Sequence, residues 1–301
     1  MILKPRDKSI THQIYDVLNY RWTLTGQHRR DYLNQISGHK GESVFDEYMA
    51  PYFKHDVVLN GLNLKNGNAE FQTDTVVVTA KRVLLYEVKN YSGAYHYRDG
   101  SFYSESGYRM RNPLGQADRA DSLLYNLMLN RGYQLTTAFY VVFINPNFSI
   151  EKLPPNPALL FPNQLHSHFR SVATPHNDQK HQQLHLAQEI LKLHNDDYRP
   201  HNLPDYRFDE LKKGIFCPKC FSTRHTDTRK MRTCLKCGHI ETITHSIQRS
   251  SKEFSLLFPD VPLTTNLIYE WIAHMYSKRR VRYALKAIYQ SCLTGPRTYY
   301  I

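Results

Sequence analysis

Apolar and polar positions follow clear periods along the first half of the chain and predict an α/β fold. Residues 71–79 and 83–89 are rich in β-branched and apolar side chains, carry no Gly or Pro, and predict two strands. Residues 56–64 predict a strand before them, and the continuous apolar run at 138–144 predicts a buried central strand. Residues 114–129 carry apolar side chains at helical spacing. We therefore expect a mixed sheet flanked by helices.

Two of these strands, separated by a short polar break, predict an antiparallel pair with charged residues on one face. A turn centred between Ala80 and Lys81 places Asp74 directly opposite Glu87, and the period of two places Lys89 on the same face. Two opposed carboxylates repel each other unless a cation lies between them, and Mg²⁺ or Mn²⁺ is the usual cation for oxygen ligands. The pair therefore predicts a metal site.

An ordinary structural interpretation of the same charges stays open at this point. Glu87 and Lys89 are also compatible with solvated positions on a half-exposed strand. The neighbouring positions Val76, Val77 and Leu84 are apolar on both faces, which favours strands that are covered on both sides and charges that need a partner. Ala-Lys is a poor hairpin turn, so a slip of one or two residues in the register is an alternative.

A short helix is expected before the strands. Gly41 precedes Glu42, apolar residues follow at helical spacing from Val44 to Met49, and Pro51 ends the pattern. Glu42 is then placed in the first helical turn, where the helix dipole favours an acid.

These motifs together resemble the nuclease-related domain (NERD) family, a branch of the PD-(D/E)xK restriction-endonuclease-like superfamily. The resemblance spans about residues 38–150. It rests on four short motifs that occur in the expected order, namely Gly41-Glu42, Gln72-x-Asp74, EVKNYSG from Glu87 and Asn112-Pro113-x-x-Gln116. Thr73 and Thr75 stand where members commonly carry Ile and His, so we expect the fit to substrate to differ while the acid itself is kept.

The resemblance implies a restriction-endonuclease-like mixed sheet core and a role for each motif residue. Asp74 and Glu87 would hold catalytic Mg²⁺ or Mn²⁺, and Lys89 would support the attacking water. Glu42 and Gln116 would assist. The implied reaction is hydrolysis of phosphodiester bonds of DNA, with RNA as an alternative, in DNA processing or in defence against foreign DNA.

The charge of the chain is strongly basic and unevenly distributed. The 301 residues carry a formal net charge of +12. Residues 1–195 hold 21 Lys and Arg against 17 Asp and Glu, whereas residues 196–301 hold 18 against 10. An excess of this kind indicates a polyanionic partner or serves solubility alone.

The cysteines predict a structural metal site in the basic C-terminal part. Cys217, Cys220, Cys234 and Cys237 form two C-x-x-C pairs, whereas Cys292 stands alone. Four thiolates at this spacing predict one tetrahedral Zn²⁺ in a zinc ribbon with no open position for catalysis. Free thiols suit a reducing cytosol, and no apolar leader or membrane-length apolar run occurs, so we expect a cytoplasmic protein.

Basic residues near the knuckles and in two further helices are candidates for nucleic-acid binding. Two helices are expected after residue 264, the first capped by Thr264 or Thr265 and the second by Ser277. The candidates in the ribbon and on the second helix are Arg229, Lys230, Arg232, Arg279, Arg280 and Arg282. A helix-turn-helix-like contact with DNA and a solvated basic face are both compatible with this pattern.

These observations divide the chain into five segments. We expect an N-terminal lead-in at 1–36, the nuclease-like domain at 37–195, a linker at 196–210, the zinc ribbon with its four cysteines at 211–245 and a basic helical tail at 246–301.

Three functions remain to be weighed. The first is a metal-dependent nuclease, which would need a homodimer to cut both strands. The second is a nucleic-acid-binding protein whose nuclease-like fold does not cleave. The third is a zinc-ribbon regulator that recruits a protein partner.

Overall fold

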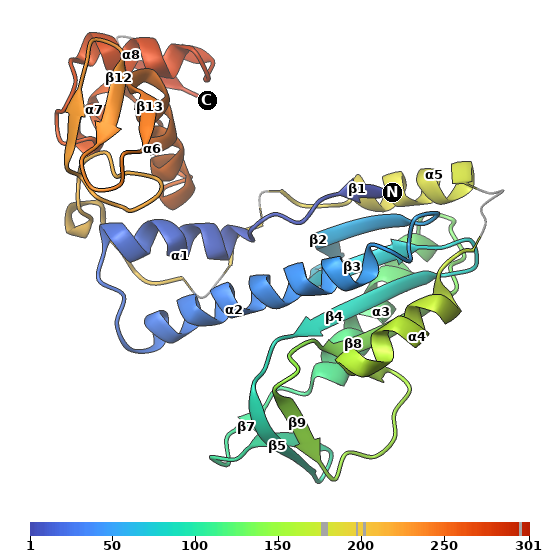
Figure 1. The fold of residues 1–301 in the computed structure, drawn as a ribbon. Coiled ribbons are helices and arrows are strands. Elements are labelled where there is room, and N and C mark those ends of the chain that lie inside the picture. The colour runs from blue at the N-terminus through green and yellow to red at the C-terminus, as the bar shows by residue number, and fades with distance from the viewer. Residues whose placement is uncertain (176–179, 197, 201–202, 295–296) are drawn as a thin grey trace. The chain divides into compact units, whose positions relative to one another are not determined.

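The computed structural model describes residues 1–175, 180–196, 198–200, 203–294 and 297–301. Contacts divide the chain into two compact units (Figure 1). We call residues 1–12 and 30–201 the sheet unit, and residues 13–29 and 202–301 the ribbon unit. Residues 13–29 thus group with the C-terminal part, and the finer five-segment division stays a prediction.

The sheet unit is built on a six-stranded mixed sheet, which confirms the predicted α/β class. Its strands, in spatial order, are β1 (Ile2–Lys4), β2 (Val57–Asn66), β3 (Ala69–Val78), β4 (Val83–Lys89), β8 (Thr137–Phe143) and β10 (Leu159–Leu160). β2, β3 and β4 pair antiparallel, whereas β4, β8 and β10 pair parallel. β1, which the sequence did not predict, pairs parallel with β2 at the sheet edge.

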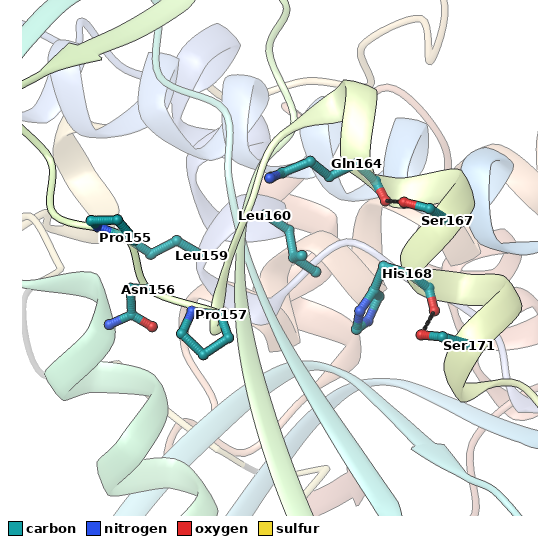
Figure 2. A pocket seen from close by; sticks show the side chains of 9 residues that line it. All are labelled: Pro155, Asn156, Pro157, Leu159, Leu160, Gln164, Ser167, His168 and Ser171. Carbon is teal, nitrogen blue, oxygen red and sulfur yellow. Dashed lines mark hydrogen bonds between the residues drawn. The ribbon is translucent and has the colours of Figure 1, made fainter.

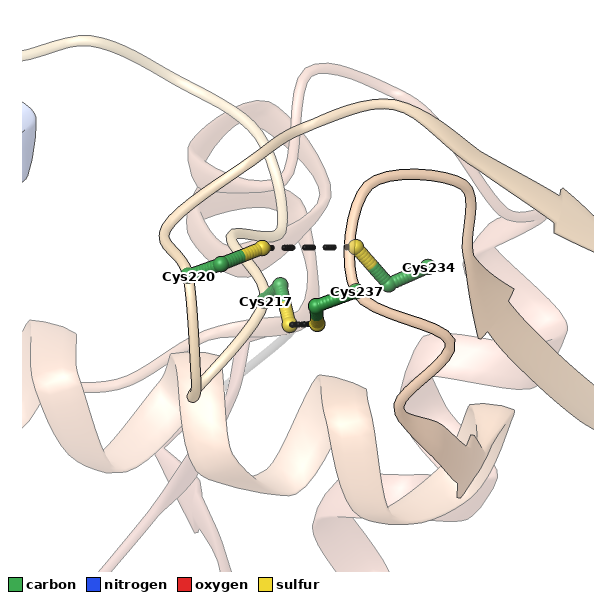
Figure 3. A group of neighbouring side chains, drawn as sticks. All are labelled: Cys217, Cys220, Cys234 and Cys237. Atoms are coloured by element: carbon green, nitrogen blue, oxygen red, sulfur yellow. Dashed lines mark hydrogen bonds between the residues drawn. The ribbon is translucent and has the colours of Figure 1, made fainter.

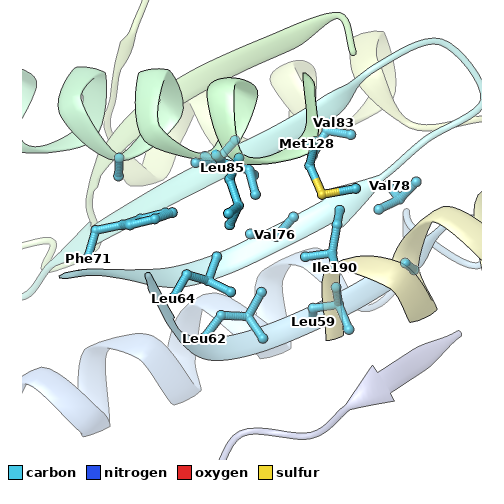
Figure 4. Packing of buried hydrophobic residues seen from close by; sticks show 14 of the residues in the cluster. Leu59, Leu62, Leu64, Phe71, Val76, Val78, Val83, Leu85, Met128 and Ile190 are labelled. Atoms are coloured by element: carbon cyan, nitrogen blue, oxygen red, sulfur yellow. The ribbon is translucent and has the colours of Figure 1, made fainter. Parts of the chain in front are cut away.

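Helices cover both faces of this sheet, which explains why residues 76–78 of β3 and 83–85 of β4 are apolar on both faces. On one face, alternate residues of β3 and β4 pack with Leu124 and Met128 of α3 (Pro113–Leu129) and with Ile190 of α5 (Lys180–Leu191). Figure 4 shows Val76 and Leu85 of the strands beside Met128 and Ile190.

The other face is formed by the intervening residues of the same strands. Val77, Leu84 and Tyr86 pack with Phe45 of α2 (Gly26–Met49) and Phe169 of α4 (Pro162–Val172). The two faces therefore form two separate hydrophobic clusters, and any charged residue at a strand end is confined to one of them.

A smaller four-stranded sheet follows β4 along the chain. Its order is β7 (Arg109–Met110), β6 (Ser101–Ser104), β5 (Gly93–Arg98) and β9 (Phe148–Glu151). β5 and β6 form a hairpin across Asp99 and Gly100, both of which have positive φ. Phe102 and Phe148 of this sheet pack with Phe143 of the main sheet, and this contact fixes the smaller sheet against the end of the larger one.

The helix that carries Glu42 is much longer than the sequence predicted. α2 begins at Gly26, so Glu42 lies in its last third and the prediction of a first-turn acid is wrong. Gly38 and Gly41 lie inside the helix, where tertiary packing overrides their low helix propensity. A Cβ at position 41 would lie 2.5 Å from the Cβ of Asn90, so Gly41 permits close contact between α2 and the end of β4.

The ribbon unit combines a small sheet with helices. Its ordered elements are α1 (Ile10–Arg21, mostly in this unit), the short helix Phe208–Glu210, β11 (His225–Asp227), β12 (Met231–Cys234), β13 (Ile240–Thr242), α6 (Ile243–Leu257), α7 (Thr265–Trp271), α8 (Lys278–Lys286), β14 (Ser291–Thr294) and β15 (Arg297–Tyr300). Thr264 and Ser277 cap α7 and α8, as predicted, whereas α6 was not predicted. None of the described helices is long and apolar enough to cross a membrane.

A buried charge network holds the ribbon unit together. The Arg21 guanidinium on α1 is fully buried, donates to Glu253 of α6 at 2.6 Å and lies 4.0 Å from the ring centroid of Trp271. Arg249 donates to both Glu253 and Glu241 at 2.8 Å. Removing one partner of such a network would leave an uncompensated buried charge, so α1 is an integral part of this unit.

Candidate active site and cysteine cluster

The acidic pair predicted from the sequence lies at the open end of the β3–β4 ladder. Thr75 pairs with Tyr86 and Val78 pairs with Val83, which is the predicted register, and its continuation places Asp74 opposite Glu87. The turn depends on Thr79, whose Oγ1 accepts from the backbone N–H groups of the second and third residues after it, at 3.3 and 3.1 Å. This side-chain turn compensates for the weak Ala-Lys sequence, and the alternative slipped registers do not occur.

Glu87, Lys89 and Gln116 form a hydrogen-bonded group on the α3 face of the sheet. Glu87 is 5% exposed, and its Oε1 accepts from Lys89 Nζ at 2.5 Å and from Gln116 Nε2 at 2.6 Å. Lys89 Nζ also donates to Gln116 Oε1 at 3.3 Å. Asn112 caps α3 through its side chain and thereby fixes the turn from which Gln116 extends. The structure thus brings together three of the residues that the motifs singled out.

Asp74 is joined to the same group through the backbone of β4. Its Oδ2 accepts the N–H of Val88 at 2.7 Å, next to Glu87 in the chain. Gln72, another motif residue, is exposed, and its side-chain amide donates to Asn63 on β2 at 2.9 Å. The hydrogen bonds of this group therefore include Asp74 from β3 but not Gln72.

Arg6, which sequence reasoning missed, connects Glu42 with Asp74. Its guanidinium donates to both carboxylate oxygens of Asp46 at 2.7 and 2.8 Å and to Glu42 Oε2 at 2.6 Å. It also donates to the backbone carbonyl of Asp74 at 3.1 Å and to Thr75 Oγ1 at 2.7 Å. No local motif marks Arg6, because its partners lie 36 to 69 residues away in the chain.

The electrostatics of this group favour a cation. Burial, followed by the charge of Asp74, raises the pKa of both Glu87 and Glu42 to about 7. Burial alone would lower the pKa of Lys89, but the charges of Glu87 and Asp74 outweigh it and raise that pKa. The raised pKa values of Glu87 and Glu42 beside Asp74 indicate that the positive charge near these carboxylates is too small to stabilise all of them in the ionised form.

The donor set suits a hard divalent cation. Asp74 and Glu87 offer carboxylate oxygens, the preferred ligands of Mg²⁺ and Mn²⁺, and Arg6 links Glu42 to the backbone carbonyl of Asp74. Within the described ranges, only the four cysteines form a group of three or more His, Cys, Asp or Glu donors that all lie within 4.8 Å of one another. The acids would therefore supply two ligands directly, with water in the remaining positions, as Mg²⁺ prefers.

The four predicted zinc ligands converge as expected (Figure 3). Sγ of Cys217 lies 3.6 Å from Sγ of Cys237, and Sγ of Cys220 lies 3.5 Å from Sγ of Cys234. Tetrahedral Zn²⁺ with bonds of about 2.3 Å separates its sulfurs by about 3.8 Å, so these four thiols fit the ion. Backbone N–H groups after Cys234 lower the pKa of its thiol, which favours the thiolate that zinc binds, whereas burial and the neighbouring thiols raise the pKa of Cys220.

The predicted basic residues divide into an exposed set and a buried one. Arg229 and Lys230 are exposed in the turn between β11 and β12, and Arg279 and Arg282 are exposed on α8. Arg280 donates to the carbonyl oxygen of Arg229, which brings this turn and α8 together.

Arg232 does not belong to that surface. It is 4% exposed and donates to Tyr276 Oη at 2.8 Å and to the carbonyl oxygen of Ile215 at 2.9 Å. Its position on the covered face of β12 explains the burial, since neighbouring residues of a strand face opposite sides. We therefore correct the sequence-based set by removing Arg232.

A groove beside β10 is lined by none of the predicted catalytic residues (Figure 2). It is lined by Leu160 and by residues of α4 that include His168. His168 is half-buried, and its Nε2 lies 3.0 Å from Tyr86 Oη. Burial lowers its pKa to about 4, so the ring is neutral at pH 7.

Comparisons with known proteins support the resemblance stated from the motifs. Residues 37–144 match the family described as "Nuclease-related domain". The chain therefore carries a nuclease-related domain, and this domain contains Glu42, Asp74, Glu87, Lys89 and Gln116.

Two further comparisons add less. No curated protein matches the chain. Among solved structures, the crystal structure of protein VC1899 from Vibrio cholerae is similar at 15% identity and a TM-score of 0.25, over 57% of this chain and 38% of that one. This chain thus spans well under half of the length of that protein.

Proposed function

We propose that this chain is a metal-dependent nuclease that hydrolyses phosphodiester bonds of DNA. The observation that carries the proposal is the convergence of Asp74, Glu87, Lys89 and Gln116 within a nuclease-related domain. A phosphodiester carries its own negative charge, so its hydrolysis requires positive charge at the reacting phosphate.

Each residue has a task that follows from its position. Asp74 and Glu87 would hold Mg²⁺ or Mn²⁺, which when bound supplies Lewis acidity at the phosphate. Lys89 stays protonated because its pKa is raised, so it would orient water and offset phosphate charge rather than act as a base. Gln116 holds Glu87 and Lys89 in place, and Arg6 orients Glu42 and the backbone at Asp74.

The ribbon unit would hold the substrate. Its four cysteines would bind a structural Zn²⁺, and its exposed arginines and lysines would contact phosphates, which gives affinity that depends little on sequence. A role in DNA processing or in defence against foreign DNA, a homodimer that cuts both strands and a cytoplasmic location belong to the same proposal.

The decisive experiment compares purified wild type with Glu87→Gln and Lys89→Met on linear, circular and single-stranded DNA, in Mg²⁺, in Mn²⁺ and without divalent metal. We expect cleavage with either metal and its loss in both variants. Glu70→Gln is the matched control, because Glu70 lies on the same strand as Asp74 but pairs with the exposed Lys65 at 4.0 Å. The two variants test the catalytic metal site more specifically than EDTA does, because EDTA would also remove zinc.

A second candidate function is a nucleic-acid-binding protein that does not cleave. The exposed basic residues of the ribbon unit favour it, because they need no catalytic metal to bind phosphates. If wild type binds DNA but leaves every substrate intact with either metal, and Mn²⁺ binding is the same in Asp74→Asn as in wild type, the nuclease proposal is wrong and this second function stands.

A further inference from the structure

Helix α8 has one buried and one exposed face of different chemistry. Val281, Ala284 and Leu285 are buried and face the unit's interior, where α6 and α7 contact α8. The opposite face carries four exposed side chains at the spacing i, i+3, i+4 and i+7, which places them on one stripe of the helix: Arg279, Arg282, Tyr283 and Lys286. Three cations thus surround one tyrosine.

The turn between β11 and β12 extends this cationic stripe. Arg280 of α8 donates to the carbonyl oxygen of Arg229, so Arg229 and Lys230 lie beside the first turn of α8. α8 itself contains no Asp or Glu. The folded unit therefore gathers cations from two segments that lie about 50 residues apart.

A role in solubility would explain exposed cations on α8, but it does not explain the exposed aromatic ring of Tyr283. Its side chain is 70% exposed, although it is a large aromatic residue on a helix whose other face provides a buried core. An exposed aromatic ring between cations is the arrangement that binds single-stranded nucleic acid, because every unpaired base offers a flat face for stacking while the cations contact phosphates. In a duplex the base faces are already stacked, so Tyr283 would have nothing to stack on.

We propose that α8 and the adjacent turn bind single-stranded DNA, with phosphates on Arg279, Arg282 and Lys286 and an unpaired base stacked on Tyr283. This inference rests on the proposed function, since it names the form of the substrate that the ribbon unit holds. Duplex DNA would bind the same cations more weakly than single strands and without Tyr283.

The test measures binding without cleavage. Full-length Glu87→Gln, loaded with zinc, is titrated against a labelled mixed-sequence strand of about 20 nucleotides and against the same strand annealed to its complement. We expect Tyr283→Ala in this background to weaken single-strand binding by about 5- to 150-fold and to leave duplex binding within about 2-fold. Tyr283→Phe keeps the ring and should retain the affinity. Tyr108→Ala, which removes a tyrosine that is 73% exposed in the sheet unit, is the matched control.

Salt dependence tests the phosphate contacts separately. Arg279→Ala and Arg282→Ala should each reduce the slope of log K against log salt by about 0.7 on the single strand, the value for one lost phosphate contact. Zinc content and circular dichroism, unchanged from the parent, would show that each variant folds.

The results separate this inference from the nuclease proposal. Equal binding by Tyr283→Ala and its parent, equal losses on single strand and duplex, or no binding by the parent to either probe would each overturn the inference. If wild type fails to cut while single-strand binding depends on Tyr283, the inference stands and the nuclease proposal falls.

Discussion

Arg6 offers the strongest test of the site as the structure shows it. Its side chain is only 5% exposed and forms ion pairs with Glu42 and Asp46, whose side chains are 25% and 24% exposed. We expect Arg6→Met to break both ion pairs while it keeps a long side chain. The lost guanidinium would leave two partly buried carboxylates without their cation.

The magnitude follows from the burial. Removing one partner of a buried ion pair costs about 3–5 kcal/mol, and the partial exposure of both acids places this loss near about 3 kcal/mol. For a unit of this size, a loss of that amount lowers the melting temperature by about 6–12 °C. Arg6→Lys keeps the charge but cannot donate to all four partners, so its loss should be intermediate.

The assay is thermal unfolding followed by calorimetry, in the transition that belongs to the sheet unit. Lys65→Met is the control, because Lys65 is 54% exposed and its 4.0 Å pair with Glu70 is expected to contribute less than about 1 kcal/mol. A second measurement is Mn²⁺ affinity, which we expect Arg6→Met to weaken about 10-fold through the loosened backbone at Asp74. Arg6→Met that melts within about 1 °C of wild type would refute the reasoning.

Three further predictions follow from other parts of the molecule. Gly41→Ala should lower the free energy of unfolding by about 1–3 kcal/mol, because the added Cβ would lie 2.5 Å from the Cβ of Asn90. Gly38→Ala, where the added Cβ would meet no atom within 4 Å, should raise the free energy of unfolding by about 0.5–1 kcal/mol. Denaturant unfolding measures both changes. The pKa values of Glu87 and Glu42 are raised from 4.5 to about 7, so the metal-free fold binds more protons than the unfolded chain and loses stability as the pH rises from about 4.5 to about 7. Glu87→Gln should reduce this dependence in denaturant titrations to the part that Glu42 contributes, and an unchanged slope would contradict the raised pKa of Glu87. Cys220→Ser should abolish the binding of one zinc per chain and, with it, the cooperative melting of the ribbon unit, whereas the sheet unit should still melt cooperatively. A zinc-free ribbon unit that melts as in wild type would exclude a structural role for the metal.

The sequence by itself determined the local arrangement around the acidic pair. The period of two along β3 and β4 fixes which side chains share a face, and the short turn leaves few registers, so Asp74 opposite Glu87 was predictable. Asn112-Pro113 likewise marks the start of α3 and hence the place of Gln116. The cysteine spacing predicted the thiol cluster, because two C-x-x-C turns supply the four thiolates that a tetrahedral zinc site takes.

Only the tertiary structure decided the contacts that join distant segments. Arg6 reaches Asp74 across 68 residues of chain, and α2 extends back to Gly26 although its internal glycines disfavour helix. Arg232 and Arg282 are the same residue type and cannot be told apart in sequence, yet the first is buried and the second exposed. Whether a side chain is buried depends on which elements pack against it, and those elements are distant in the sequence. The free energy of burial therefore follows from the tertiary structure and not from local sequence.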